Sequence, residues 1–230
     1  MKILKRLTTT LLAGVVIAGC GNGDSANAAD AAATSAEAKK VTDVLMNKDS
    51  PEMKKQGPDK YKARFETAKG AFVIEVERKL SPRGADRFYN LVNNGYYDGV
   101  KFFRVVHGFV VQWGMHGDPE INAIWSESNI MDDPVATTNA KGTITFAKPS
   151  QPNARSTQVF INYKDNAFLD KMGFPPFGHV SEGMEVVEAL NGEYKDGPTG
   201  KQGEIAEGGN AYLNETFPNL DTILSAKIVD

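Results

Sequence analysis

One short stretch of the sequence, residues 102–112, combines polar side chains that could act on a ligand with aromatic ones that could hold it. Arg104 carries a permanently charged guanidinium that donates hydrogen bonds, and Gln112 carries an amide that both donates and accepts them. On a single strand these two side chains share a face and Phe109 takes the other, unless Gly108 bends or bulges the strand. The alternative is an amphipathic strand with one solvated arginine.

Several familiar reaction motifs are missing from the sequence. Gly200-Lys201 lacks the earlier glycine of a phosphate-binding loop, and no Gly-x-Ser-x-Gly nucleophile elbow occurs. His107, His116 and His179 lack the i, i+4 spacing of a helical zinc site, and none of them follows a cysteine pair. We therefore expect no metal, no cofactor and no covalent nucleophile.

The composition is that of an ordinary soluble globular chain. Of its 230 residues, 41% are hydrophobic and 24% are charged, which suffices to bury a core without disulfides. The single cysteine rules out an intramolecular disulfide. A formal net charge of −3 offers no basic surface to phosphates, so we expect no nucleic acid partner, and we expect a monomer.

The first twenty residues, 1–20, have the layout of a secretory signal peptide. A basic start precedes the apolar run 7–18, which is shorter than the roughly 20 residues of a membrane-spanning helix. The run ends in Ile17-Ala18-Gly19-Cys20, which resembles the bacterial lipobox, where the cysteine is lipidated after cleavage. The sequence thus predicts a lipoprotein of the bacterial cell envelope, anchored to the membrane through Cys20. The alternative is an incidental cysteine at an ordinary cleavage site.

Residues 21–60 are predicted to be a flexible tether between this anchor and a folded domain over 61–230. The part from 21 to 40 has no aromatic or large aliphatic residue and cannot bury enough surface to order itself. Helical periodicity over 38–53 allows a short amphipathic helix that ends near Pro51.

Most of the folded domain is predicted to be β-structure, with two amphipathic helices. The expected strands are a hairpin over 63–78, one run over 101–113, and segments 142–148, 158–162 and 222–229. The expected helices cover 82–94 and 182–191, and a long loop is expected from Gly114 to Pro134. Many strands and two helices indicate a mainly β fold, a closed antiparallel barrel capped at its ends.

The stretch 102–112 resembles the signature of the cyclophilins, a family of peptidyl-prolyl isomerases. The resemblance continues in order from about Lys62 to Val229, through segments 90–99, 142–147, 157–162, 168–170, 177–180 and 183–187. It implies a closed eight-stranded antiparallel barrel with two capping helices. It also implies an isomerase that accelerates rotation about X-Pro bonds in proline-containing envelope polypeptides, without a cofactor.

The resemblance also assigns site residues. Arg104 and Gln112 would be catalytic: the guanidinium can donate to the imide nitrogen, whose lone pair becomes available only when the amide resonance breaks. It therefore favours the twisted state over either planar isomer. The proline-binding residues would be Phe109, Val110, Ala147, Lys148, Gln158, Phe160, Phe168, Leu169 and Phe174.

Some positions depart from the family pattern. Val110 stands where methionine is common, Phe168 where relatives carry a tryptophan linked to tight cyclosporin binding, and Phe174 where many have histidine or tyrosine. The segment 192–220 is longer and richer in glycine than in short cyclophilins, and no role is predicted for it. A catalytically weak proline-peptide binding or chaperone module and an envelope structural protein are the alternatives. The presence of Arg104 favours the isomerase.

Overall fold

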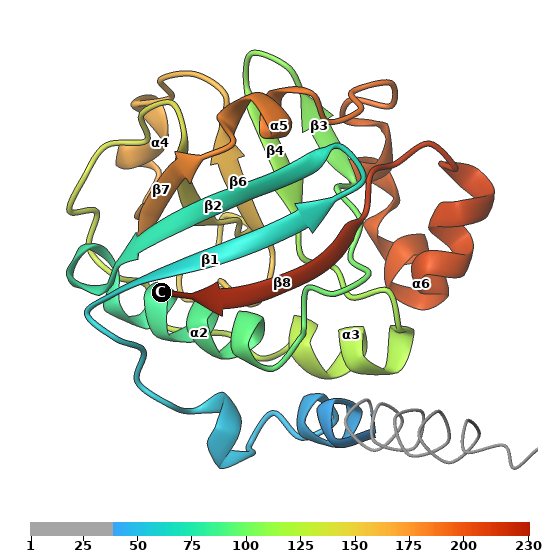
Figure 1. Cartoon of the computed structure of the whole chain (residues 1–230), viewed down its shortest axis with the longest axis horizontal. Coiled ribbons are helices and arrows are strands. Elements are labelled where there is room, and N and C mark those ends of the chain that lie inside the picture. The colour runs from blue at the N-terminus through green and yellow to red at the C-terminus, as the bar shows by residue number, and fades with distance from the viewer. Residues whose placement is uncertain (1–38) are drawn as a thin grey trace, which may run out of the picture. The chain divides into compact units, whose positions relative to one another are not determined.

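An eight-stranded antiparallel sheet forms the centre of the structure, a computed structural model that describes residues 39–230 (Figure 1). Its strands are β1 (Lys60–Thr67), β2 (Gly70–Glu77), β3 (Arg104–Val106), β4 (Val110–Trp113), β5 (Thr143–Phe146), β6 (Val159–Asn162), β7 (Gly178–Glu182) and β8 (Ile223–Val229). They are ordered β3-β4-β6-β5-β7-β2-β1-β8 across the sheet. The predicted eight-stranded antiparallel architecture is confirmed.

The sheet curls until its two edges approach each other, but β3 and β8 do not form a ladder. The segments just before these strands meet instead, at an isolated bridge between Lys101 and Thr222. The amide of Gly99 donates to the carbonyl of Ile223 at 2.8 Å, and that of Phe102 donates to Asp221 at 3.0 Å. The barrel predicted as closed is therefore a curled sheet joined across its opening by two connecting segments.

The β1–β2 hairpin follows directly from the sequence. Alternate residues of β1 are buried, and the chain reverses at Gly70, whose φ of +122° is easily accessible only to glycine. The inward-facing rings of Phe65 and Phe72 stack with their centroids 5.1 Å apart, and Trp113 of β4 packs edge-on against Phe65 at 5.9 Å. These aromatic side chains form the middle of the core.

Two helices lie on opposite sides of the curled sheet, α2 (Pro82–Asn93) and α5 (Met184–Glu188), as Figure 1 shows. Proline at the first position starts α2, and its buried face places Phe88 5.0 Å from the ring of Phe177. In α5, Val187 is buried. Both lie where the sequence predicts helices, although α5 is shorter than the predicted 182–191.

Three further helices occupy segments where no helix was predicted: α3 (Pro119–Ser126), α4 (Phe168–Lys171) and α6 (Gln202–Thr216). In α3, the side chain of Asp118 caps the helix by accepting from the amide of Glu120 at 2.8 Å. The predicted loop 114–134 was therefore wrong over α3. Within α6, Gly209 interrupts the helical backbone with a φ of 54°, and such an interruption obscures the helical period.

The compact unit starts at residue 39, ahead of the domain boundary predicted at 61. Residues 39–45 are helical, and Leu45 and Met53 are buried in the main core. The indole Nε1 of Trp125 donates to the carbonyl of Leu45 at 2.8 Å, and Asn90 donates to that of Lys55 at 2.8 Å. The predicted signal peptide, Cys20 and the predicted tether up to residue 38 lie outside the described residues. Among residues 39–230, no helix combines the length and apolar character that a membrane span requires.

A buried ion pair joins the start of α2 to the loops of one end of the sheet. The side chain of Arg155 is fully buried and its Nη2 donates to Asp133 Oδ2 at 3.0 Å. The same carboxylate accepts from Ser81 Oγ at 2.7 Å and from the amide of Gly84 at 3.0 Å. Burial by itself raises the pKa of Asp133, but these hydrogen bonds and the charge of Arg155 outweigh it and lower the pKa below the usual value.

Candidate active site

Arg104 and Gln112 meet because the run 101–113, predicted as one strand, is a hairpin of β3 and β4. The chain turns at Gly108, whose φ is +77°, and the amide of Phe109 donates to Val106 at 2.9 Å. Arg104 is the cross-strand partner of Gln112, and directly opposed residues point to the same face of a sheet. The guanidinium Nη1 donates to Gln112 Oε1 at 3.2 Å. The prediction that Arg104 and Gln112 share a face was correct. The pairing of β3 with β4 produces this shared face, and not the alternation of side chains along a single strand.

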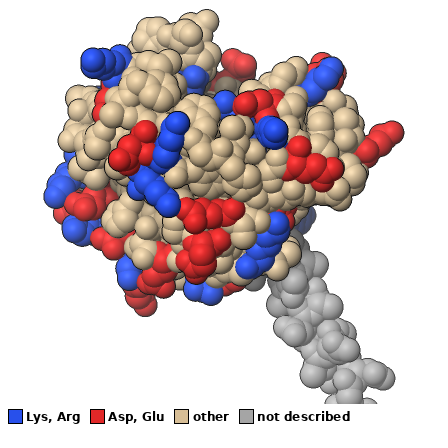
Figure 2. Space-filling view, turned by 90° about the horizontal axis from the view of Figure 1, so that it is seen from above, with Lys and Arg blue, Asp and Glu red and all other residues tan. Residues whose placement is uncertain are grey.

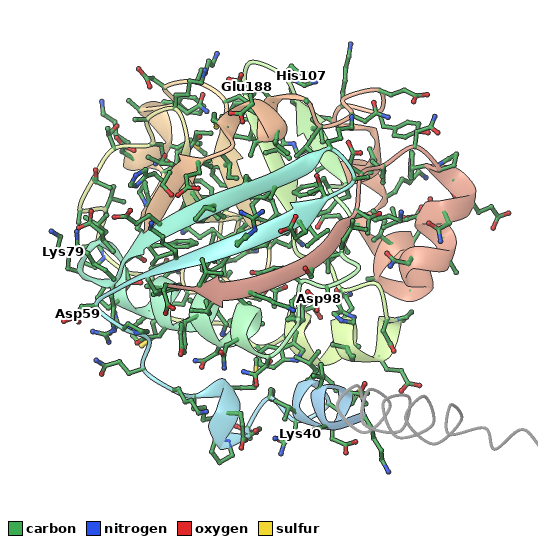
Figure 3. The ribbon with its side chains drawn as sticks, in the orientation of Figure 1. Lys40, Asp59, Lys79, Asp98, His107 and Glu188 are labelled. Atoms are coloured by element: carbon green, nitrogen blue, oxygen red, sulfur yellow. The ribbon has the colours of Figure 1, made fainter. Side chains whose placement is uncertain are left out.

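His107, labelled in Figure 3, lies in the same turn and is exposed. Its ring stacks on Tyr163 with the centroids 5.5 Å apart. Beside it, the carbonyl of Phe109 accepts from the amide of Tyr163 at 2.9 Å and from Asn166 Nδ2 at 3.1 Å. These bonds fix the backbone that carries the Phe109 ring.

An apolar cluster lies beside the arginine. Val110, Phe160 and Leu169 are its buried members, and Phe109, Ala147 and Phe174 pack against them half-buried. Phe160 of β6 is the cross-strand partner of Gln112, so it faces the same side as the polar pair. The short helix α4 supplies Leu169, and the chain returns through Gly173, whose φ is +76°.

Together these side chains line a groove of about 440 Å³. Ten of the predicted site residues line it: Arg104, Phe109, Val110, Gln112, Ala147, Lys148, Gln158, Phe160, Leu169 and Phe174. Phe168 does not. It is 54% exposed and stacks on the outer side of the Phe109 ring at 6.3 Å. Adjacent residues of a helix point in different directions, so α4 sends Leu169 inward and Phe168 outward.

The sequence did not predict five other lining residues, namely Pro149, Ala154, Ser156, Thr199 and Gln202. The last two belong to the segment 192–220. Gln112 Nε2 donates to Gln158 Oε1 at 2.8 Å, and Gln158 Nε2 donates to Gln202 Oε1 at 3.0 Å. A chain of amides therefore runs from the arginine along the groove to the first residue of α6.

Two cations lie at aromatic faces of the groove. The Cζ of Arg104 is 5.3 Å from the centroid of Phe109, and Nζ of Lys148 is 5.9 Å from that of Phe174. Asp132 accepts from Lys148 Nζ at 3.3 Å. Over the face drawn in Figure 2, acidic and basic side chains are interspersed.

The lining residues include no histidine, cysteine or carboxylate, and residues 39–230 contain no metal-binding group of three or more such side chains. The groove therefore offers hydrogen-bond donors, acceptors and apolar contact, without the histidine or carboxylate that most often acts as a general base.

Comparison with known proteins gives a consistent result. Residues 62–209 match the family described as cyclophilin type peptidyl-prolyl cis-trans isomerase/CLD. The chain is 32% identical over 138 residues to peptidyl-prolyl cis-trans isomerase cyp18 of Streptomyces antibioticus, covering 55% of this chain and 80% of that one. It is 27% identical over 177 residues to peptidyl-prolyl cis-trans isomerase B of Escherichia coli, covering 72% and 97%.

The fold is similar to that of solved structures. A cyclophilin type peptidyl-prolyl cis-trans isomerase of Cryptosporidium parvum superposes with a TM-score of 0.55 at 19% identity, over 74% of this chain and 98% of that one. A second structure of that protein, determined in the presence of the dipeptide Ala-Pro, has a TM-score of 0.54 at 20% identity, over 74% and 99%.

Proposed function

Because the chain belongs to the cyclophilin-type peptidyl-prolyl cis-trans isomerases, we propose that its groove binds a proline of an extracytoplasmic polypeptide and catalyses X-Pro rotation through Arg104. The observation that carries this proposal is the position of the guanidinium, at the edge of an apolar cluster in a groove whose lining has no histidine, cysteine or carboxylate. Such a site suits a reaction in which no covalent bond is made or broken.

The chemistry follows from the X-Pro bond. Rotation crosses a barrier of about 18 to 20 kcal/mol because the amide resonance is lost in the twisted state. The imide nitrogen then regains a lone pair that can accept a hydrogen bond, and the guanidinium of Arg104 is a permanently charged donor. The donor binds the twisted state better than either planar isomer, so it lowers the barrier. An acceleration of about 10⁵-fold corresponds to a barrier lowered by about 7 kcal/mol.

The remaining groove residues hold the substrate. The pyrrolidine ring is apolar, and the buried side chains Val110, Phe160 and Leu169 provide a matching surface. Gln112 both accepts from Arg104 and donates to Gln158, so it can orient the guanidinium or bind the substrate backbone.

The direct test is a protease-coupled isomerisation assay of the purified protein with an X-Pro peptide, accompanied by binding of Ala-Pro measured by NMR. We expect catalysis together with binding. Binding to a folded protein without any catalysed rate would show the alternative function, a proline-peptide binding or chaperone module.

Replacing Phe109 by alanine should weaken peptide binding by about tenfold, because the ring is one apolar wall of the groove. The ring is only half-buried, so the free energy of unfolding should fall by about 1 kcal/mol, less than for a fully buried phenylalanine. Peptide titration and thermal unfolding measure the two effects. Leu224→Ala, an exposed apolar residue outside the groove, is the control and should change neither. Unchanged affinity in Phe109→Ala would contradict the assignment of the groove.

We also propose that the protein is a lipoprotein of the bacterial cell envelope, attached to the membrane through Cys20. The basic start, the apolar run 7–18 and the lipobox-like Ile17-Ala18-Gly19-Cys20 support the proposal. Its polypeptide substrates would then be other proteins of the envelope.

Cys20→Ser should abolish incorporation of labelled fatty acid, because the hydroxyl replaces the thiol that would be acylated. The measurement is metabolic labelling with a palmitate analogue, followed by membrane fractionation of cells that express the parent or the variant. Equal labelling of the variant and the parent would refute the anchor.

A further inference from the structure

The guanidinium of Arg104 is held on three sides. Its Nη1 donates to Gln112, and its Cζ lies 5.3 Å from the ring centroid of Phe109. Its Nε donates to Oδ1 of Asp196 at 2.5 Å, an ion pair that the sequence did not predict. Among residues 39–230, Nη2 has no hydrogen-bond partner. The plane of the group is thus fixed through two nitrogens, and the third is left to donate to a substrate.

Asp196 is itself placed by an unusual backbone conformation. Lys195, the residue before it, has a φ of +49°, a left-handed conformation that non-glycine residues rarely adopt. Asp196 then leads into the 3-10 helix Gly197–Lys201, with the amide of Thr199 donating to its carbonyl at 2.9 Å. Strained conformations of this kind persist where the surrounding structure holds them, and they concentrate at functional sites.

The segment around Asp196 is anchored on both sides. Before it, Tyr194 packs edge-on against Phe217 with the centroids 5.2 Å apart. After it, Pro198 is buried and Gln202 accepts from Gln158 inside the groove. Asp196 is therefore held against Arg104 by the same segment, 192–216, that forms part of the groove wall, although its own side chain is 58% exposed.

We propose that Asp196 is a positioning residue for catalysis, which orients the guanidinium of Arg104 so that Nη2 faces the twisted X-Pro bond. The inference rests on the proposed function of the groove. A charged hydrogen bond to Nε is stronger than a neutral one and restricts the long arginine side chain before substrate arrives. Donors that are oriented in advance need no rearrangement in the transition state, and misplacement by about 1 Å is costly to the rate.

The test compares Asp196→Ala, Asp196→Asn and the parent in the isomerisation assay, with the peptide Kd measured separately. We expect Asp196→Ala to lower kcat/KM by about tenfold at an unchanged Kd, because orientation affects the twisted state and not ground-state binding. Asp196→Asn keeps the size of the side chain and an acceptor oxygen, so its activity should be intermediate. Glu207→Ala, an exposed acid on α6, is the matched control and should keep the parent activity.

A double substitution separates positioning from a general effect on the fold. If Asp196 acts through Arg104, then adding Asp196→Ala to Arg104→Ala should cause no further loss of activity. If the double variant lost activity by the product of the two single losses, the inference would be overturned. Unchanged or increased activity in both Asp196 variants would also overturn it. The inference would also be overturned if peptide binding weakened as much as kcat/KM fell, because Asp196 would then act on substrate binding. A parent protein without isomerase activity would instead refute the proposed function.

Discussion

Replacing Arg104 by alanine should lower kcat/KM for X-Pro rotation by about 10²–10³-fold, the usual effect of removing one oriented donor from a transition state. The side chain faces the groove and takes little part in the core, since its ion pair with Asp196 is partly exposed. The variant should therefore keep its melting temperature within a few degrees, and it should bind a proline peptide with the parent affinity. The isomerisation assay, peptide titration and thermal unfolding measure the three quantities.

Arg64→Ala is the matched control for this experiment. Arg64 lies on β1, is 45% exposed and, within residues 39–230, pairs only with Glu66, so the charge changes equally while the groove is untouched. Its activity should equal that of the parent. Full activity in a folded Arg104→Ala protein would refute the mechanism, whereas a fall in affinity equal to the fall in rate would make Arg104 a binding residue.

Replacing Arg155 by alanine should reduce the free energy of unfolding by about 3–5 kcal/mol, because it leaves the carboxylate of Asp133 buried without its buried positively charged partner. For a domain of this size, the melting temperature should fall by roughly 10 °C.

Arg83→Ala is a stringent control: Arg83 pairs with the same carboxylate at 3.2 Å, but its side chain is 52% exposed. Arg83→Ala should lower the free energy of unfolding by less than about 1 kcal/mol. If both variants lowered the free energy of unfolding equally, the buried ion pair would not stabilise the fold more than the exposed one, and the prediction would be wrong.

The same ion pair gives stability a definite pH dependence. The pKa of Asp133 is lowered in the folded protein, so the carboxylate contributes stability above its unfolded pKa of about 3.9. That contribution is lost as the pH falls through the folded pKa. Denaturant titrations across the acid range should therefore show a steeper loss for the parent than for Asp133→Asn, which has no carboxylate to protonate at this position.

The sequence was informative where structure is local. The alternation over 63–78 predicts the β1–β2 hairpin, and the apolar period over 82–94 predicts α2, because each element buries one face. The run 101–113 was misinterpreted because its turn consists of only a few residues around Gly108 and interrupts no hydrophobic pattern. The helix α6 escaped prediction because its period is broken at Gly209.

The groove shows a similar division. Ten of the eleven expected site residues line it because the resemblance to the family carries their positions, and Phe168 lies just outside. Asp196 and Gln202 were not predicted. They come from a segment without periodicity and reach Arg104 and Gln158 through tertiary contacts 92 and 44 residues apart. No local pattern in a sequence encodes such a meeting.

The pairing of β1 with β8 determines when the fold can be completed. These strands lie side by side, with Lys62 opposite Val229, and Asp98, labelled in Figure 3, accepts from the amide of Ala226 at 2.7 Å. Since β8 comes last of the eight strands in the sequence, one edge of β1 stays without its partner until residues 223–229 have joined the sheet. Such high contact order makes folding slow, on the order of milliseconds to seconds, and leaves an edge on which nascent chains can associate. Pairing with β8 therefore covers an edge of β1 that would otherwise be open to pairing with another chain.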